Sequence, residues 1–386
     1  MRKIYVDNSS TTFPKPKEVG DAVYDYLTNI GANVGRGNYQ SSYSTSRIVY
    51  ETRELICEMF NFDEPRNVVF TTNITESLNV ILKGFLKKGE HVIITSMEHN
   101  AVIRPIHTLL NKGINHSIVP CNKQGLINLK DLEKSINSST KLILVTHVSN
   151  VSGSIMPIDE IAAIAKKYNI YYVIDSAQSA GILPINFNDL RLAALPLTGH
   201  KGLLGPQGIG AIILREDFAA KLDTLKEGGT GSFSEALIQP DILPDKFESG
   251  TLNVPGIIGL NASLKWIKAR GIENIYEHEK LLGKIFLDNV MNIKGVNLYG
   301  SKDINNRLSV FSINMDNIDA SEAAYILDSE YGIMTRCGLH CSPLAHKTLG
   351  TFPEGTIRIS LGYFNTKDDI EYISKALNDI SKAKRG

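Results

Sequence analysis

A single lysine, Lys201, lies in the glycine-rich stretch 197–208, three residues after Thr198 and next to His200. Glycines allow tight backbone conformations and let the chain approach a ligand closely. A lysine held in such a loop could form a Schiff base with a carbonyl cofactor, most commonly pyridoxal 5'-phosphate (PLP). A lysine between glycines can equally be a solvated loop residue, so the stretch alone leaves both interpretations open.

Polar side chains also follow four short apolar runs that we predict to be buried strands. In parallel sheets, ligands bind beyond the carboxyl ends of the strands. An aspartate there, such as Asp175, could hold a pyridine nitrogen protonated, and an asparagine such as Asn150 could donate to a phenolic oxygen or a carboxylate. The ordinary alternatives are helix capping and an Asx turn. The four segments are 71–77, 98–100, 147–150 and 175–178.

The elements that must position these groups alternate between apolar runs and amphipathic helical patterns. Such alternation predicts an α/β fold with a mostly parallel sheet covered by helices on both faces. The expected strands lie at 68–70, 92–94, 142–145, 171–174 and 210–214, and the expected helices at 17–29, 42–60 and 77–85.

Beyond about residue 255 the pattern changes to that of a smaller α+β domain. We expect a large PLP-binding domain at 16–255 and a small domain made of 1–15 plus 256–386. The segment 228–250 shows no clear element and exceeds the usual connection length, which favours a functional role. Expected helices in the small domain lie at 257–270, 272–293, 321–331 and 367–382, and expected strands at 310–314 and 356–360.

The totals exclude several classes of protein. The 386 residues carry 41 Lys+Arg and 41 Asp+Glu, so no net charge favours nucleic acid or an anionic membrane as partner. No apolar run suggests a signal peptide or a membrane span. Four cysteines in so long a chain favour reduced thiols and a cytoplasmic location. Cys337 and Cys341 lack a second Cys/His pair, so we expect no metal site.

Taken together, these motifs resemble the cysteine desulfurase and selenocysteine lyase family, which are fold-type I PLP enzymes of the class V aminotransferase group. The resemblance covers nearly the whole chain, and it implies a seven-stranded, mostly parallel sheet sandwiched by helices. It also implies a homodimer with shared active sites. The motifs that carry it are 71–77, 97–99, 147–153, 175–178, 198–201, 247–251, 336–343 and Arg358.

The resemblance implies roles for the cofactor-binding residues. Lys201 would form the Schiff base, His99 would stack on the ring, and Asp175 would pair with the pyridine nitrogen. Gln178 would contact the phenolic oxygen, beside Asn150. The residues expected to hold the phosphate are Ile74, Thr75, Thr198 and His200, with Thr251 reaching the phosphate of the neighbouring subunit.

The substrate side resembles the short-loop, group II pattern, in which Cys341 is the nucleophile. Arg358 would clamp the substrate α-carboxylate at two points, assisted by Asn150, and Arg336 would also lie at the substrate. Nearby positive charge from Arg336 and His340 would favour the thiolate. The alternatives without a catalytic role are a surface ion pair for Arg358 and an inert buried thiol for Cys341.

The function implied is conversion of L-cysteine to L-alanine, with the sulfur left on Cys341 as a persulfide for an acceptor protein in iron–sulfur cluster or thio-cofactor synthesis. The alternatives are selenocysteine lyase, another class V transaminase or β-lyase, and a catalytically silent scaffold. The chain departs from the group II pattern at Leu339, where a histidine is usual, and at Cys337, which adds a second thiol.

Overall fold

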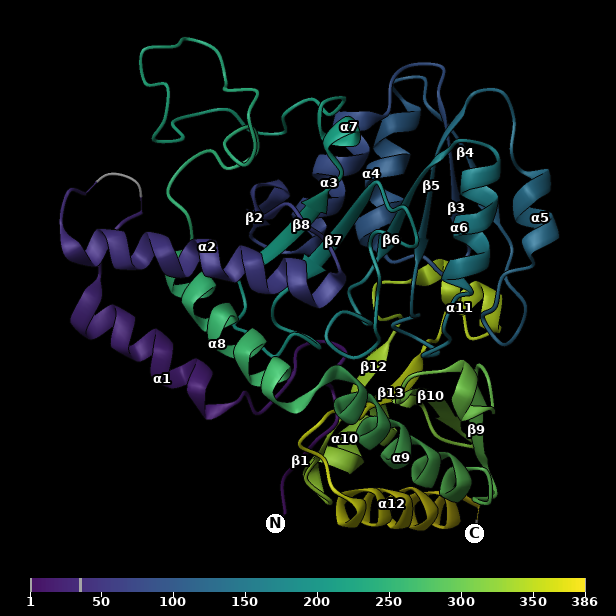
Figure 1. The fold of residues 1–386 in the computed structure, drawn as a ribbon. Helices are drawn as coiled ribbons and strands as arrows, with labels where there is room; N and C mark the ends of the chain where they lie inside the picture. Colours follow the sequence, from purple (N-terminus) through teal and green to yellow (C-terminus); the bar gives the residue numbers. More distant parts are fainter. Residues whose placement is uncertain (1, 35–36, 386) are drawn as a thin grey trace.

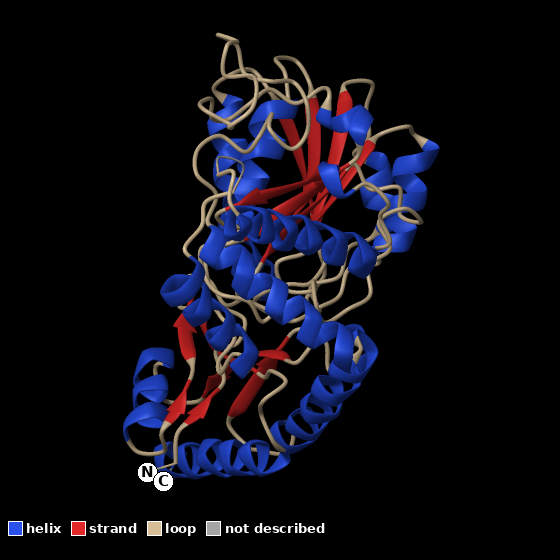
Figure 2. Cartoon of the chain, turned by 60° about the vertical axis from the view of Figure 1, so that its left-hand side comes forward, coloured by secondary structure: helices blue, strands red, loops and turns tan. Residues whose placement is uncertain are grey.

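A computed structural model describes residues 2–34 and 37–385, which form two bodies, one above the other in Figure 1. The upper body holds a seven-stranded sheet and the lower body a four-stranded sheet. Both chain ends lie at the lower body (Figures 1 and 2). Helices flank the strands of the upper body on both sides (Figure 2).

The large sheet has the strand order β2-β8-β7-β6-β5-β3-β4, and only β8 runs antiparallel to its neighbours. The predicted α/β class with a mostly parallel seven-stranded sheet is therefore confirmed. The strands are β2 (Val68–Thr71), β3 (His91–Thr95), β4 (Asn115–Val119), β5 (Thr140–Thr146), β6 (Tyr171–Asp175), β7 (Ala194–Thr198) and β8 (Gly210–Leu214).

Alternation along each strand builds two apolar layers, because successive side chains point to opposite faces of a sheet. In β5, Leu142 and Leu144 pack on the face covered by α3, α4 and α7. Ile143 and Val145 pack on the opposite face, which α2, α6 and α8 cover. These strands are apolar on both faces, and that explains their continuous apolar runs.

Helices of this body are α1 (Lys17–Asp25), α2 (Gln40–Phe60), α3 (Ile74–Phe85), α4 (Asn100–Leu110), α5 (Leu129–Lys134), α6 (Ile158–Lys167), α7 (Glu216–Ala219) and α8 (Val254–Arg270). The helix expected at 17–29 changes into a π-helical turn at Tyr26–Ile30 and ends at Gly31 in the left-handed conformation. No helix or strand lies between Ala219 and Val254, as the sequence predicts for 228–250.

The lower body places β10 at the centre of its sheet, with order β12-β13-β10-β9. A separate short strand, β1, pairs in parallel with β11, so the N-terminus joins this body. Ile4 and Val6 share its apolar core. Its elements are β1 (Ile4–Tyr5), α9 (Ile272–Val290), β9 (Val296–Tyr299), β10 (Val310–Met315), α10 (Ala320–Ser329), β11 (Ile333–Met334), β12 (Arg336–Gly338), β13 (Thr356–Ser360) and α12 (Lys367–Arg385). Between β12 and β13 in the chain, α11 (Pro343–Leu349) packs Ala345 and Leu349 into the apolar core of the upper body. The domain boundaries at 15 and 255 remain a prediction.

Two strands of the large sheet, β4 and β7, are not among those predicted from the sequence. β4 is an edge strand with largely exposed or half-buried side chains, so it lacks an apolar run. β7 contains Pro196, a residue that usually argues against an interior strand. The buried Ser176 hydroxyl donates to the Pro196 carbonyl at 2.5 Å, so a side chain after β6 contacts the middle of β7.

Candidate active site

A cavity of about 480 Å³ lies where the parallel strands of the large sheet end. It receives side chains that follow β2, β3, β5, β6 and β7, together with residues of the lower body. The parallel order explains this convergence, since the carboxyl ends of the strands meet at one edge. The lining residues that matter below are Ser10, Ile74, Thr75, His99, Asn150, Asp175, Gln178, Thr198, His200, Lys201, Arg336, His340 and Arg358.

Lys201 and Asp175 face this cavity from neighbouring strand ends. Burial lowers the pKa of Lys201 to about 8, with Arg358 and Arg336 adding to the effect and Asp175 opposing it. The following glycine is required by space, because a Cβ at Gly202 would lie 2.5 Å from the carbonyl oxygen of Ala180. Lys201 is therefore held in a tight loop as an amine that is easily deprotonated.

Asp175 ends β6 and is buried, which raises its pKa, while the amide of Ala177 donates to Oδ1 at 2.9 Å and opposes that shift. His99 is the N-cap of α4, and its Nδ1 accepts a hydrogen bond from the amide of Ala101 at 3.0 Å. Burial and the nearby cations lower its pKa to about 4. The neutral ring therefore carries its proton on Nε2.

The cavity wall also contains buried polar atoms without a partner. They include Oγ1 of Thr198 and Nδ1 of His200. The same cavity is lined by Ile74 and Thr75, which form the first turn of α3, where backbone amides have no carbonyl partner within the helix. Amides and hydroxyls in this arrangement suit a phosphate group. These groups and the buried carboxylate of Asp175 fit the two ends of PLP.

Gln178 is oriented by the N-terminal segment. Its Nε2 donates to the carbonyl of Ser9 at 3.1 Å, and the side chain is buried in the cavity wall. This bond uses one of the two amide hydrogens, so the other stays available for the predicted contact with a phenolic oxygen.

Arg358 is buried in the centre of β13 and turns its guanidinium into the cavity. Its Nη2 bonds Asp7 Oδ1 at 2.6 Å and Ser10 Oγ at 2.7 Å, and its Nη1 bonds the carbonyl of Asn150 at 3.1 Å. Its Nε has no partner. Sequence reasoning did not identify Asp7 or Ser10, since neither follows a strand of the large sheet.

Arg336 lies beside Arg358 and reaches towards the exposed thiol of Cys341. Its Nη1 bonds Ser10 Oγ at 2.9 Å, and its Nη2 lies 3.7 Å from Sγ of Cys341. Cys341 does not line the cavity, but Arg336, which reaches its sulfur, and His340, which precedes it in the chain, do. The structure therefore places the predicted nucleophile at the edge of the site.

The expectation that His340 supplies positive charge to Cys341 is wrong. The imidazole is buried and turned towards β13, with Nε2 3.1 Å from the carbonyl oxygen of Thr356. Burial and the neighbouring cations lower its pKa to about 2, so the ring is neutral. Arg336 is thus the cation that the structure places at the thiol.

Thr251 does not line this cavity. It lies beside a separate hollow of about 300 Å³ that also involves Arg53 and Glu248. Glu248 forms a buried two-point ion pair with Arg53 at 2.9 and 2.8 Å and accepts the amide of Phe70 at 2.6 Å. This pair fixes the segment before Thr251 against α2 and β2.

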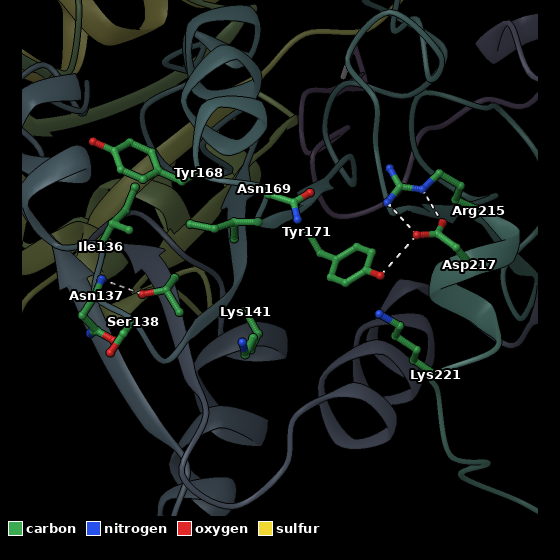
Figure 3. Close-up of a pocket in the computed structure, with 12 residues that line it drawn as sticks. Ile136, Asn137, Ser138, Lys141, Tyr168, Asn169, Tyr171, Arg215, Asp217 and Lys221 are labelled. Atoms are coloured by element: carbon green, nitrogen blue, oxygen red, sulfur yellow. Dashed lines mark hydrogen bonds and ion pairs between the residues drawn. The ribbon is translucent and has the colours of Figure 1, made fainter.

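A larger hollow, of about 720 Å³, lies at the opposite edge of the sheet, where β5 and β6 begin (Figure 3). There Asp217 accepts hydrogen bonds from Arg215 at 2.5 Å and from the Tyr171 hydroxyl at 3.2 Å. Its described lining contains no cysteine or histidine. The volume of a hollow therefore does not identify the active site. The reactive groups lie in the cavity of about 480 Å³ that contains Lys201.

Among residues 2–34 and 37–385, no group of three or more His, Cys, Asp or Glu side chains is arranged to bind a metal ion. Within the same ranges, none of the helices combines the length and apolar character needed to cross a bilayer.

Comparison with known proteins agrees with this geometry. The family model described as aminotransferase class-V matches residues 4–373. A probable cysteine desulfurase from Methanothermobacter thermautotrophicus is 33% identical and covers 98% of this chain and 94% of its own. A probable cysteine desulfurase from Pyrococcus abyssi is 32% identical, with coverages of 99% and 95%. The apo structure of a cysteine desulfurase from Thermococcus onnurineus NA1 superposes with a TM-score of 0.93 at 31% identity, covering 99% of this chain and 95% of that one.

Proposed function

Since the chain belongs to the class-V aminotransferase family, we propose that it is a PLP-dependent cysteine desulfurase that converts L-cysteine to L-alanine. The observation that carries this proposal is that two sets of functional groups meet at one cavity, one from the upper body and one from the lower body. One set offers an amine and a carboxylate suited to PLP. The other set offers Arg358 for a substrate carboxylate and, next to it, Arg336, which reaches the exposed thiol of Cys341. Curated relatives named as cysteine desulfurases support the assignment.

Residues of this chain would hold PLP at three points. Lys201 would bind its carbonyl carbon, Asp175 its ring nitrogen, and the α3 N-terminus with Thr198 and His200 its phosphate. His99, neutral and fixed by the amide of Ala101, would stack on the ring. When bound, PLP supplies an electron sink for the α-carbon of the amino acid.

The other steps belong to side chains of the protein. Arg358 orients the substrate carboxylate: three of its five N–H groups bond Asp7, Ser10 and Asn150, so Nε–H and one Nη1–H remain available for it. The amine of Lys201, whose pKa burial lowers to about 8, takes the α-proton. The sulfur of Cys341 attacks the substrate sulfur and breaks the carbon–sulfur bond. L-Cysteine and the Cys341 thiol thus become L-alanine and a Cys341 persulfide, with no other reactant.

A homodimer would complete the site through Thr251. Large apolar side chains are exposed on and next to α1 and α2 and in the 228–250 segment. Figure 1 shows these three parts of the chain on the same side of the upper body. Patches of this kind mark interaction surfaces. The exposed residues include Tyr24, Leu27, Tyr39, Tyr43, Phe233, Leu237, Ile238 and Ile242. We infer that a second copy of the chain covers these side chains. Thr251 of each copy would then contact the PLP phosphate in the active site of the other.

The exposed position of Cys341 also suits delivery of the persulfide sulfur to an acceptor protein. The test is persulfide mapping by mass spectrometry after reaction with L-cysteine, together with alanine formation. The Cys341→Ala variant should retain bound PLP but lose sulfide release, whereas Cys337→Ala should retain activity. Full desulfurase activity in Cys341→Ala would refute the proposal, and faster turnover of L-selenocysteine by the wild type would favour a selenocysteine lyase.

A further inference from the structure

The thiol-bearing residue Cys341 lies in a tight turn with an uncommon backbone. His340 and Cys341 have φ angles of 47° and 59°, both in the left-handed region. The amide of Ser342 donates to the carbonyl of Leu339 at 2.8 Å and closes the turn. Positive φ at both central residues is the pattern of a type I′ turn, which favours Asn and Gly rather than His and Cys.

Backbone conformations of this kind persist only where surrounding contacts impose them. Here Asn150 supplies two such contacts. Its Nδ2 donates to the carbonyl of His340 at 2.8 Å, and its Oδ1 accepts from the hydroxyl of Ser342 at 2.8 Å. The Asn150 amide therefore binds both neighbours of Cys341 in the turn.

A third contact comes from the opposite side. The first amide of α4, at Asn100, donates to the carbonyl of Cys341 at 2.8 Å. This amide has no carbonyl partner within its own helix, so the turn completes the α4 N-terminus next to His99. These hydrogen bonds fix the position of the Cys341 turn relative to α4 and to Asn150, which belong to the candidate site.

We propose that Ser342 is a positioning residue for sulfur transfer, because its hydroxyl locks the left-handed Cys341 turn to Asn150. Ser342 is fully buried, so its hydroxyl is available to Asn150 and not to solvent. Asn150 also supports Arg358 through its carbonyl, at 3.1 Å. One asparagine thus sets both the carboxylate-binding arginine and the thiol, and fixes the separation between substrate and nucleophile.

This inference rests on the proposed desulfurase function, and its test separates the two. The variant is Ser342→Ala in the PLP-loaded enzyme, and the matched control is Ser374→Ala, a buried serine of α12 whose hydroxyl bonds the carbonyl of Ile370. Loss of the hydroxyl leaves Oδ1 of Asn150 without its donor, and the turn loses a constraint. We expect kcat for L-cysteine to fall about tenfold, with KM within about twofold of the wild type.

A second readout does not depend on turnover. Iodoacetamide alkylation is followed at Cys341 and, within the same molecule, at the exposed Cys337 on β12. In Ser342→Ala the rate at Cys341 relative to Cys337 should fall about threefold, because the sulfur leaves its place beside Arg336. An unchanged kcat, or an unchanged ratio of the two alkylation rates, would overturn the proposal. If the wild type released no alanine, the proposed function would fail, and the alkylation ratio would still decide the role of Ser342.

Discussion

Arg358 and Asp7 form an ion pair inside the candidate site, with Nη2 of the arginine 2.6 Å from Oδ1 of an aspartate 351 positions earlier in the chain. The arginine side chain is 1% exposed and the aspartate 19%. The hydroxyl of Ser10 donates to Asp7 at 2.8 Å and accepts from Arg358 at 2.7 Å. The charge of Arg358, the arginine proposed to bind the substrate carboxylate, is thus balanced by a carboxylate of the protein itself.

The first prediction concerns this internal carboxylate. Asp7→Asn keeps an oxygen acceptor for Arg358 but removes a negative charge that repels the substrate carboxylate. We expect KM for L-cysteine to fall about threefold, with kcat nearly unchanged. Asp7→Ala instead removes the acceptor and leaves a buried guanidinium without its partner, which should cost about 3 kcal/mol of folding stability.

Steady-state kinetics and urea unfolding of both variants test this assignment. A KM that rises equally in Asp7→Asn and Asp7→Ala would show that the charge of Asp7 helps substrate binding instead of opposing it.

The second prediction concerns the protonation of Lys201. Burial lowers its pKa to about 8, so its neutral amine is abundant at a pH where an ordinary lysine is still charged. The rate at which PLP-free protein takes up PLP should rise with pH and level off above about 8. Visible absorbance follows the uptake, and borohydride reduction with peptide mapping confirms that Lys201 is the residue labelled. A rate that climbs steadily to pH 10 would contradict the lowered pKa.

The core of the site was predictable because sheet topology alone brings strand ends together. Polar residues after apolar runs gave His99, Asn150 and Asp175, and the glycine-rich loop gave Lys201. All four line one cavity. Their chemical roles remain predictions, since they depend on bound molecules and not on placement.

The other half of the site was not predictable in the same way. The contact of Asp7 with Arg358 depends on the pairing of the two-residue strands β1 and β11 and on a single bridge between Asp7 and Ser360, and neither has a sequence pattern. The neutral His340 could not be foreseen either, because its charge depends on burial and on the partner that Thr356 provides. Local sequence identifies groups, but tertiary contacts determine which atoms remain free.

The third prediction concerns acid stability. Burial lowers the pKa of both His147 and His346 to about 4. In the unfolded chain a histidine takes up a proton below about pH 6.5, whereas these two remain neutral in the folded protein. Their contribution to stability is therefore complete above about pH 6.5 and is lost as the pH falls towards 4, by about 1.4 kcal/mol per pH unit for each.

Urea unfolding midpoints measured between pH 7 and 5 test this pH dependence. His346→Gln should make the midpoint less dependent on pH, while His107→Gln, at an exposed position of α4, should leave the dependence unchanged. The same slope in all three proteins would exclude His346 as a source of this pH dependence.

The last prediction concerns the buried pair that precedes Thr251. Arg53 and Glu248 are each 6% exposed in their side chains, whereas the pair Lys265–Glu51, which also involves α2, is 50% and 39% exposed. Removing one partner of a buried pair leaves an uncompensated charge and costs about 3 kcal/mol, while an exposed pair contributes about 0.5 kcal/mol. Glu248→Gln should therefore lower stability far more than Glu51→Gln, as measured by urea unfolding. Because Glu248 anchors the segment before Thr251, the same variant should also weaken PLP binding in the proposed dimer, measured by equilibrium titration. Equal losses of stability in the two variants would show that the Arg53–Glu248 pair does not hold this segment.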